Sequence, residues 1–89
     1  MKKTRDNIAL ITGASRGLGS AISHELALKK FHTILAARTI GSLEEVYDRI
    51  IGVGGTASVL PLDIMDEESI KKSCLTIYDR WKKIDLWVH

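Results

Sequence analysis

Three glycines between Thr12 and Gly19 have the spacing of a loop that binds an anionic ligand. Gly13 permits a sharp turn at the end of an apolar run, and Gly17 lacks a Cβ that would keep a ligand away from the backbone. Gly19 permits close packing of the following helix, whose first N–H groups point toward an anion placed there. Because a strand pattern precedes the loop and a helical pattern follows it, the segment predicts a dinucleotide-binding site rather than a bare turn.

The end of the second apolar run carries residues that would distinguish NADP(H) from NAD(H). Ala37 stands where NAD-binding proteins tend to have an acidic residue that accepts a hydrogen bond from the ribose 2′-hydroxyl. Arg38 follows it and Arg16 lies in the glycine loop, and a planar guanidinium group binds phosphate oxygens in pairs. Ser15 and Thr39 supply hydroxyl groups for the same phosphate. The pattern favours NADP(H), and the alternative is that Arg38 is a solvated surface side chain.

The elements that must position these residues follow from four short apolar runs. The runs lie at residues 8–11, 33–37, 57–60 and 86–88. They are almost continuously apolar, which is typical of parallel strands that are covered on both faces. Helical spacing between the runs predicts a doubly wound α/β sheet of the Rossmann type with the strand order 3-2-1-4.

Three stretches between these runs have helical spacing. The first extends from about Leu18 to Lys30, with two lysines in its last turn, where cations suit the helix dipole. The second begins at Ser42, with Glu45 completing a capping box, and the third begins at Asp66 as its N-cap. The expected core-facing stripes are Leu18, Ile22 and Leu26; Leu43, Val46 and Ile50; and Ile70, Cys74, Ile77 and Trp81.

The composition excludes several classes of function. The 89 residues include 13 basic and 11 acidic side chains, and the net charge of +2 is too balanced for a nucleic-acid or membrane-surface protein. The single cysteine, Cys74, excludes an intramolecular disulfide and a thiolate metal cluster, and we expect a buried, inert thiol. His24 and His32 lack partners at ligand spacing, so no metal site is expected. No apolar segment is long enough for a signal peptide or a membrane span, so we expect a soluble cytoplasmic protein.

The motif Thr-Gly-x-x-x-Gly-x-Gly at residues 12–19 resembles that of the short-chain dehydrogenase/reductase family, in its single-domain branch. Further similarity lies in Ala-Arg at 37–38, Leu-Asp-Ile at 62–64 and Ile-Asp-Leu-Trp-Val-His at 84–89, where His89 departs from the family's asparagine. The resemblance implies an NADP(H)-dependent oxidoreductase that transfers hydride between nicotinamide and a carbonyl or alcohol substrate, with 3-oxoacyl compounds as one substrate type. It also implies a small-molecule substrate and a homo-oligomer.

The resemblance assigns further residues to the cofactor. It implies that Asp63 accepts a hydrogen bond from the adenine amino group and that Ile64 lies against the ring, with a turn or cap role as the alternative for Asp63. Asp85 is interpreted as a turn residue. The residues predicted to bind the cofactor are Gly13, Ser15, Arg16, Gly17, Leu18, Gly19, Ala37, Arg38, Thr39, Asp63 and Ile64.

The family's catalytic serine and its Tyr-x-x-x-Lys pair are expected beyond residue 89, so no catalytic residue is predicted within the chain. Tyr78 and Lys82 match that spacing by letter, but they lie at the end of a helix that precedes the fourth apolar run. We therefore expect residues 1–89 to be the N-terminal part of one Rossmann dinucleotide-binding domain that is poorly stable by itself. The alternative function is a non-catalytic dinucleotide-binding module or a truncated regulatory protein. A relative of the sugar-nucleotide epimerases fits the glycine spacing less well.

Overall fold

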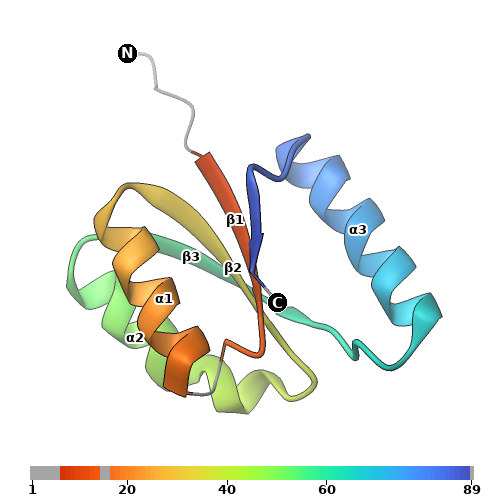
Figure 1. Cartoon of the computed structure of the whole chain (residues 1–89), viewed down its shortest axis with the longest axis horizontal. Helices are drawn as coiled ribbons and strands as arrows, with labels where there is room; N and C mark the ends of the chain where they lie inside the picture. The colour runs from red at the N-terminus through yellow and green to blue at the C-terminus, as the bar shows by residue number, and fades with distance from the viewer. Residues whose placement is uncertain (1–6, 15–16, 89) are drawn as a thin grey trace.

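The computed structural model describes residues 7–14 and 17–88, except for the side chain of Ile40. Within this part of the chain, strands form a parallel sheet in the order β3-β2-β1-β4 (Figure 1). The strands are β1 (Asn7–Thr12), β2 (Phe31–Ala37), β3 (Thr56–Pro61) and β4 (Leu86–Val88). The register pairs Ala9 of β1 with Thr33 on one side and with Leu86 on the other. The predicted strand order is confirmed.

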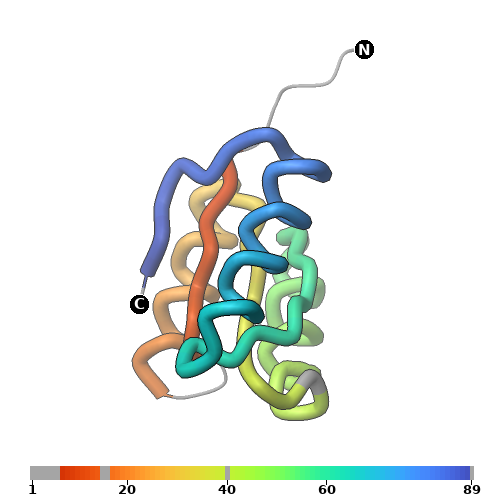
Figure 2. Tube along the Cα trace, turned by 90° about the vertical axis from the view of Figure 1, so that its right-hand side faces the viewer, coloured from red at the N-terminus to blue at the C-terminus, as the bar shows by residue number. Residues whose placement is uncertain are grey.

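Helices cover both faces of this sheet. They are α1 (Gly17–Leu28), the short 3-10 helix η1 (Ile40–Leu43), α2 (Glu44–Gly52) and α3 (Glu67–Trp81). Figure 1 shows α1 and α2 on one face and α3 on the other, which confirms the doubly wound α/β fold. In Figure 2 the C-terminal strand lies beside β1, with which it pairs at the edge of the sheet.

The core explains why the apolar runs are continuous. Alternate residues of β1 point to opposite faces, so Ala9 and Ile11 join one buried cluster while Ile8 and Leu10 join another. The first cluster adds the buried residues Ala14, Ala27, Leu35, Leu43, Val46 and Ile50, and the second adds Ile34, Ala36, Leu62 and Ile77. Since residues 8–11 of β1 are buried on both faces, these four positions favour apolar side chains.

Helix α1 differs from the prediction in its end and in its buried face. It ends at Leu28, and Lys30 follows in the left-handed region at φ 72°, so the lysines lie beyond the last turn. The side chain of Leu18 is 77% exposed, whereas Ser23 and Ala27 are buried. Small side chains permit the helix to approach the sheet closely, and the Ser23 hydroxyl donates to the Gly19 carbonyl at 2.7 Å. The predicted stripe was therefore wrong at Leu18.

The start of α2 also differs from the prediction. A capping box at Ser42 was wrong, because α2 begins at Glu44 and its N-cap, Leu43, makes no side-chain cap hydrogen bond. The Ser42 hydroxyl instead donates to the carbonyl of Thr39 at 2.6 Å, within η1. A serine hydroxyl can bond a carbonyl three residues earlier, and this local bond competes with capping. The predicted core stripe of α2, Leu43, Val46 and Ile50, is buried.

Helix α3 begins as predicted, and its predicted stripe packs in the core at Ile70, Ile77 and Trp81 but not at Cys74. Asp66 is the N-cap, and its Oδ1 accepts a hydrogen bond from the Glu68 N–H at 3.0 Å. The expectation that Cys74 is buried was wrong: its side chain is exposed, and the neighbouring Ser73 is buried together with Ile77. A serine is buried in α1 as well, at Ser23.

No helix in residues 7–14 and 17–88 is long and apolar enough to cross a membrane. The same residues contain no group of three or more histidine, cysteine or acidic side chains arranged to hold a metal ion. His32 lies between two hydroxyl groups, with Nδ1 2.8 Å from Thr56 Oγ1 and Nε2 3.0 Å from Ser58 Oγ.

Candidate functional site

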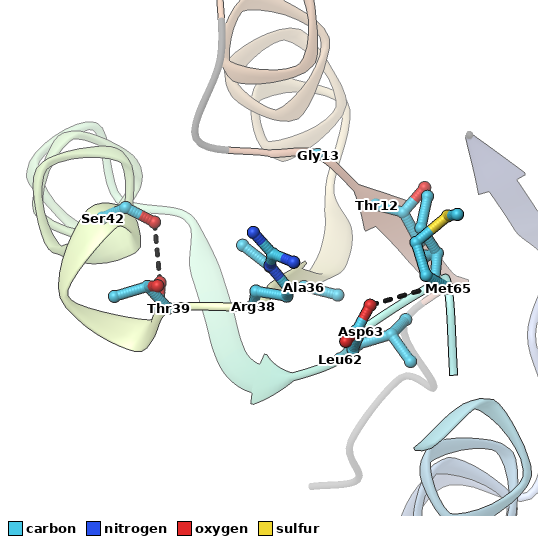
Figure 3. A pocket seen from close by; sticks show the side chains of 11 residues that line it. Thr12, Gly13, Ala36, Arg38, Thr39, Ser42, Leu62, Asp63 and Met65 are labelled. Atoms are coloured by element: carbon cyan, nitrogen blue, oxygen red, sulfur yellow. Dashed lines mark hydrogen bonds between the residues drawn. The ribbon is translucent and has the colours of Figure 1, made fainter. Parts of the chain in front are cut away.

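A cavity of about 570 Å³ lies at the carboxyl ends of β1, β2 and β3 (Figure 3). It is lined by Thr12, Gly13, Ala36, Ala37, Arg38, Thr39, Ser42, Leu62, Asp63, Ile64 and Met65. The chain proceeds outward from β1 to β3 and then returns to place β4 beside β1. In open α/β sheets, ligands bind beyond the carboxyl ends of the strands where the strand order reverses. The cavity therefore has the position expected of a ligand site.

The cavity gathers six of the residues predicted to bind a cofactor: Gly13, Ala37, Arg38, Thr39, Asp63 and Ile64. Gly17, Leu18 and Gly19 form the first turn of α1 and do not line the cavity. Ser15 and Arg16 lie outside the described residues.

The glycine loop packs tightly against its own helix. Gly13 has φ 68°, in the left-handed region that favours glycine, and its N–H donates to the Ala36 carbonyl at 3.1 Å. A Cβ on Gly19 would lie 2.4 Å from the Gly13 carbonyl oxygen, closer than real atoms approach. A Cβ on Gly17 would meet nothing within 4 Å. The loop thus requires glycine at 19 for internal packing, while position 17 faces open space.

The end of β2 presents an unpaired cation to the cavity. Figure 3 shows the Arg38 guanidinium extending into the space between the Thr39–Ser42 turn and Gly13. Arg38 is exposed and makes no ion pair within residues 7–14 and 17–88. Ala37 carries no charge that could neutralise it. An exposed guanidinium without a carboxylate partner, beside a hydroxyl, suits an anion such as phosphate.

Thr39 keeps its hydroxyl available for a ligand. The residue is the N-cap of η1 with extended backbone angles, φ −116° and ψ 117°, yet its side chain makes no cap hydrogen bond. The carbonyl group of Thr39, in contrast, accepts two hydrogen bonds from Ser42, through the hydroxyl at 2.6 Å and the N–H at 3.3 Å. Thr39 lines the cavity next to Arg38.

Asp63 has a turn role and a second oxygen that is not used in the turn. Its Oδ1 accepts a hydrogen bond from the Met65 N–H at 2.9 Å, the dashed contact at the right of Figure 3. The Asp63 N–H donates to Ser69 Oγ at 3.0 Å. Within the described residues no hydrogen bond is made by the other carboxylate oxygen, so Asp63 can accept one from a ligand in the cavity.

The lining supplies the kinds of group that a nucleotide requires. Arg38 offers a cation, Thr39 a hydroxyl, Asp63 a carboxylate oxygen, and Ile64 and Met65 offer apolar surface. Met65 is 86% exposed, so its flexible side chain can adapt to a flat ring. This donor and acceptor set fits an adenosine bearing a phosphate group.

Two predicted features lie away from the cavity. Asp85 Oδ2 accepts the Ile8 N–H at 2.7 Å and lies 3.1 Å from Lys83 Nζ, and the hydrogen bond from Ile8, followed by Lys83, lowers the pKa of Asp85. Asp85 therefore joins the start of β4 to β1 by a hydrogen bond, which is a more specific role than the expected turn role. Tyr78 and Lys82 lie at the end of α3 that is farther from the cavity-lining Met65, with Lys82 Nζ 5.6 Å from the centre of the Tyr78 ring.

Five lining residues were not among the predicted site residues: Thr12, Ala36, Ser42, Leu62 and Met65. Thr12 precedes the first glycine, and its hydroxyl donates to the Val88 carbonyl at 3.2 Å. Leu62 and Met65 flank the predicted pair at 63–64, so inspection of one more residue on each side would have found them. Ser42 carried no such signal, because its sequence context indicated a helix start.

Comparison with known proteins decides the family. A family model described as short chain dehydrogenase matches residues 7–89. The chain belongs to the short-chain dehydrogenase family. The resemblance inferred from the glycine motif is thereby confirmed, and the cavity of this short-chain dehydrogenase lies at the strand ends where the motif begins.

Curated relatives of this short-chain dehydrogenase include reductases. A fatty acyl-CoA reductase from Acinetobacter baylyi is 42% identical over 69 residues, which cover 78% of this chain and 23% of the relative. The dehydrogenase/reductase SDR family member 11 from Homo sapiens is 30% identical over 91 residues, covering 100% of this chain and 35% of the relative. The chain thus spans between about a quarter and about a third of the length of these relatives.

Solved structures share the fold and differ in their cofactor. A metagenomic short-chain oxidoreductase in complex with NADP has a TM-score of 0.89 and 28% identity, covering 91% of this chain and 37% of that protein. A protein described as a D-mannonate oxidoreductase from Haemophilus influenza, with bound NAD, has a TM-score of 0.82 and 25% identity. The match covers 91% of this chain and 29% of that protein. Similar structures therefore hold either dinucleotide.

Proposed function

We propose that this chain is the cofactor-binding part of an NADP(H)-dependent oxidoreductase. The bound cofactor supplies the hydride that is exchanged with a carbonyl or alcohol carbon of the substrate. The observation that carries the proposal is the exposed guanidinium of Arg38, which lies on the cavity beside the uncharged Ala37 and has no acidic partner in the described residues. Membership of the short-chain dehydrogenase family supports the class of reaction.

The proposal assigns the 2′-phosphate of NADP(H) to the end of β2. Arg38 binds phosphate oxygens through its fork of N–H donors, and the Thr39 hydroxyl donates a further hydrogen bond. Ala37 leaves room where an acidic side chain would repel the phosphate. Ser15 and Arg16 belong to the same proposal from their place in the glycine motif, although they lie outside the described residues.

The adenine ring and the pyrophosphate are assigned to neighbouring parts of the site. The carboxylate oxygen of Asp63 that is not used in the turn accepts a hydrogen bond from the adenine amino group, and Ile64 lies against the ring. The pyrophosphate passes over Gly13 and Gly17 toward the first turn of α1, formed with Leu18 and Gly19, where unpaired N–H groups favour an anion.

The residues that transfer the proton are proposed to lie outside this chain. Residues 1–89 would form the N-terminal part of one dinucleotide-binding domain, in agreement with the small share of each relative that they cover. A serine and a Tyr-x-x-x-Lys pair beyond residue 89 would complete the site. The intact protein is proposed to be a cytoplasmic homo-oligomer that acts on a small molecule.

The substrate class is proposed from the relatives. Curated relatives from Acinetobacter baylyi and Mycobacterium tuberculosis are named fatty acyl-CoA reductases. They favour an acyl compound with a reactive carbonyl group, and the 3-oxoacyl type implied by the family resemblance is one such compound. The described residues lie at the adenosine side of the site, so they discriminate between cofactors rather than between substrates.

Direct binding measurements test the proposal. NADPH, NADH, 2′,5′-ADP and 5′-AMP are titrated into the protein by isothermal titration calorimetry, with thermal unfolding as a check of the fold. We expect NADPH to bind at least about tenfold more tightly than NADH, and 2′,5′-ADP at least about tenfold more tightly than 5′-AMP. Charge-assisted hydrogen bonds to the 2′-phosphate account for a difference of this size. Equal affinities within each pair would refute the NADP(H) assignment. Binding without hydride transfer by the full-length protein would favour a non-catalytic module.

A further inference from the structure

The turn that follows β2 is closed by two hydrogen bonds from Ser42 and by one from the Glu44 N–H to the Gly41 carbonyl. The Ser42 hydroxyl donates to the carbonyl oxygen of Thr39 at 2.6 Å, and the Ser42 N–H donates to the same oxygen at 3.3 Å (Figure 3). The hydroxyl contact is short for a hydrogen bond between neutral groups, whereas the N–H contact is long. The side chain of Ser42 therefore contributes the better of the two bonds that close the turn.

The turn is anchored at both ends but exposed between them. At its start, the Ala37 carbonyl accepts the Leu62 N–H at 2.9 Å, and at its end the Leu43 side chain is completely buried. Arg38, Thr39 and Ser42 are exposed, and neither Arg38 nor Thr39 makes a side-chain hydrogen bond within the described residues. Gly41 lies inside the turn, and a Cβ there would meet nothing within 4 Å.

Without the Ser42 hydroxyl, the exposed part of the turn would have more conformational freedom. Gly41 permits many backbone conformations, and the Thr39 carbonyl would keep only the long bond from the Ser42 N–H, while the Glu44 N–H still bonds the Gly41 carbonyl. Two of the groups assigned to the 2′-phosphate, Arg38 and Thr39, lie in this exposed part. A ligand that binds a loosened turn must order it first, and that cost reduces the affinity.

We propose that Ser42 is a positioning residue for cofactor selectivity, an inference that rests on the proposed NADP(H) function. Its hydroxyl holds the Thr39 carbonyl and so fixes the backbone from which Arg38 and Thr39 reach the 2′-phosphate. Ser42 acts through these two residues, because its own hydroxyl proton is already donated to Thr39. Cofactors without a 2′-phosphate make no use of this arrangement.

Comparison of Ser42→Ala with Ser42→Thr tests whether the hydroxyl of Ser42, and not its small size, supports binding of the 2′-phosphate. The loss of one neutral hydrogen bond should weaken NADPH and 2′,5′-ADP binding about twofold to tenfold in calorimetry. NADH and 5′-AMP affinities should change by less than about twofold. Ser42→Thr keeps the hydroxyl and should restore the NADPH to NADH affinity ratio. Ser58→Ala, which removes a hydroxyl bonded to His32 outside the cavity, is the matched control and should leave the ratio unchanged.

A double-mutant cycle with Arg38→Leu tests whether Ser42 acts through the arginine. If it does, Ser42→Ala should weaken 2′,5′-ADP binding clearly less in the Arg38→Leu background than in the wild type. Full additivity, or an equal loss for NADPH and NADH from Ser42→Ala alone, would overturn the positioning role. Absence of any NADPH preference in the wild type, with no effect of Arg38→Leu, would overturn the proposed function and this inference together. An effect of Arg38→Leu without any effect of Ser42→Ala would overturn this inference alone.

Discussion

The carboxylate of Asp85 accepts the backbone N–H of Ile8 at 2.7 Å, and the Ile8 carbonyl accepts the Asp85 N–H at 2.8 Å. This pair of bonds joins the residue before β4 to the second residue of β1. Lys83 Nζ lies 3.1 Å from the same Asp85 oxygen. Asp85 thus links β1 and β4 through a charged acceptor.

Replacing Asp85 should make the stability of the fold less dependent on pH in the acidic range. The Ile8 N–H, followed by Lys83, lowers the pKa of Asp85 below 3.8 in the folded chain. The stabilisation is therefore present above the unfolded-state pKa and is lost as the pH falls through the lower folded-state value. Asp85→Ala should reduce the melting temperature at pH 7, and the gap to the wild type should shrink below about pH 4. Thermal unfolding by circular dichroism measures both, and a gap that stays constant with pH would contradict the prediction.

Exchange of the residues at the end of β2 should reverse the cofactor preference. In Ala37→Asp combined with Arg38→Leu, a carboxylate is added at position 37 and the guanidinium at position 38 is removed, so the 2′-phosphate is repelled and the ribose 2′-hydroxyl gains an acceptor. NADPH affinity should fall about tenfold to a hundredfold, the range for charge-assisted hydrogen bonds. Fluorescence titration with NADPH and NADH measures the change. Lys29→Leu, which removes a cation just after α1 and outside the cavity lining, is the control and should alter neither affinity.

Replacement of Gly17 and replacement of Gly19 should have different effects: the first on dinucleotide binding, the second on stability. Gly19→Ala places a Cβ 2.4 Å from the Gly13 carbonyl oxygen, and the resulting strain should destabilise the fold by about 1–3 kcal/mol. Gly17→Ala meets no atom within 4 Å, so stability should be retained while dinucleotide binding weakens, because the methyl group enters the space assigned to the pyrophosphate. Denaturant unfolding and NADPH titration of both variants provide the comparison. Equal stability of the two variants would argue against the described loop packing.

The exposed thiol of Cys74 should react readily in the folded chain. Since Cys74 lies on the solvent side of α3, Ellman's reagent should label it completely without denaturant. Cys74→Ser should change the free energy of unfolding by less than about 0.5 kcal/mol, as is usual for surface positions. Ser73→Leu, one residue earlier, should destabilise the chain because Ser73 is buried against the sheet. Protection of the thiol until the chain unfolds would contradict this orientation of the helix.

The fold was predictable because its signals are redundant. Continuous apolar runs indicate parallel strands, the Asp66 cap marks a connecting helix, and the glycine loop indicates the Rossmann type of sheet, for which the strand order 3-2-1-4 is expected. The faces of α1 and α3 were less predictable. Helical periodicity counts apolar residues, so it identified Ile22, Leu26 and Ile77 on the core side but not the buried serines Ser23 and Ser73.

The site was predictable where single residues carry the chemistry. Arg38 comes directly after β2 and Asp63 comes two residues after β3, and both residues line the cavity. Ser42 was not predictable as part of the site, because the same serine followed by Glu45 also matches a helix cap. Which bond the hydroxyl makes depends on the conformation of η1, and that conformation depends on burial of Leu43 in the core.

The bond between Ile8 and Asp85 also has a consequence for the order of folding. It joins residues 77 positions apart, whereas the pairing of β1 with β2 joins Ala9 to Thr33 across a much shorter stretch of chain. Closing a longer loop costs more entropy, so contacts between distant residues tend to form late. We therefore expect β1, β2 and their connecting helix to assemble first, with β4 docking last. Replacement of Asp85 should then accelerate unfolding far more than it slows folding.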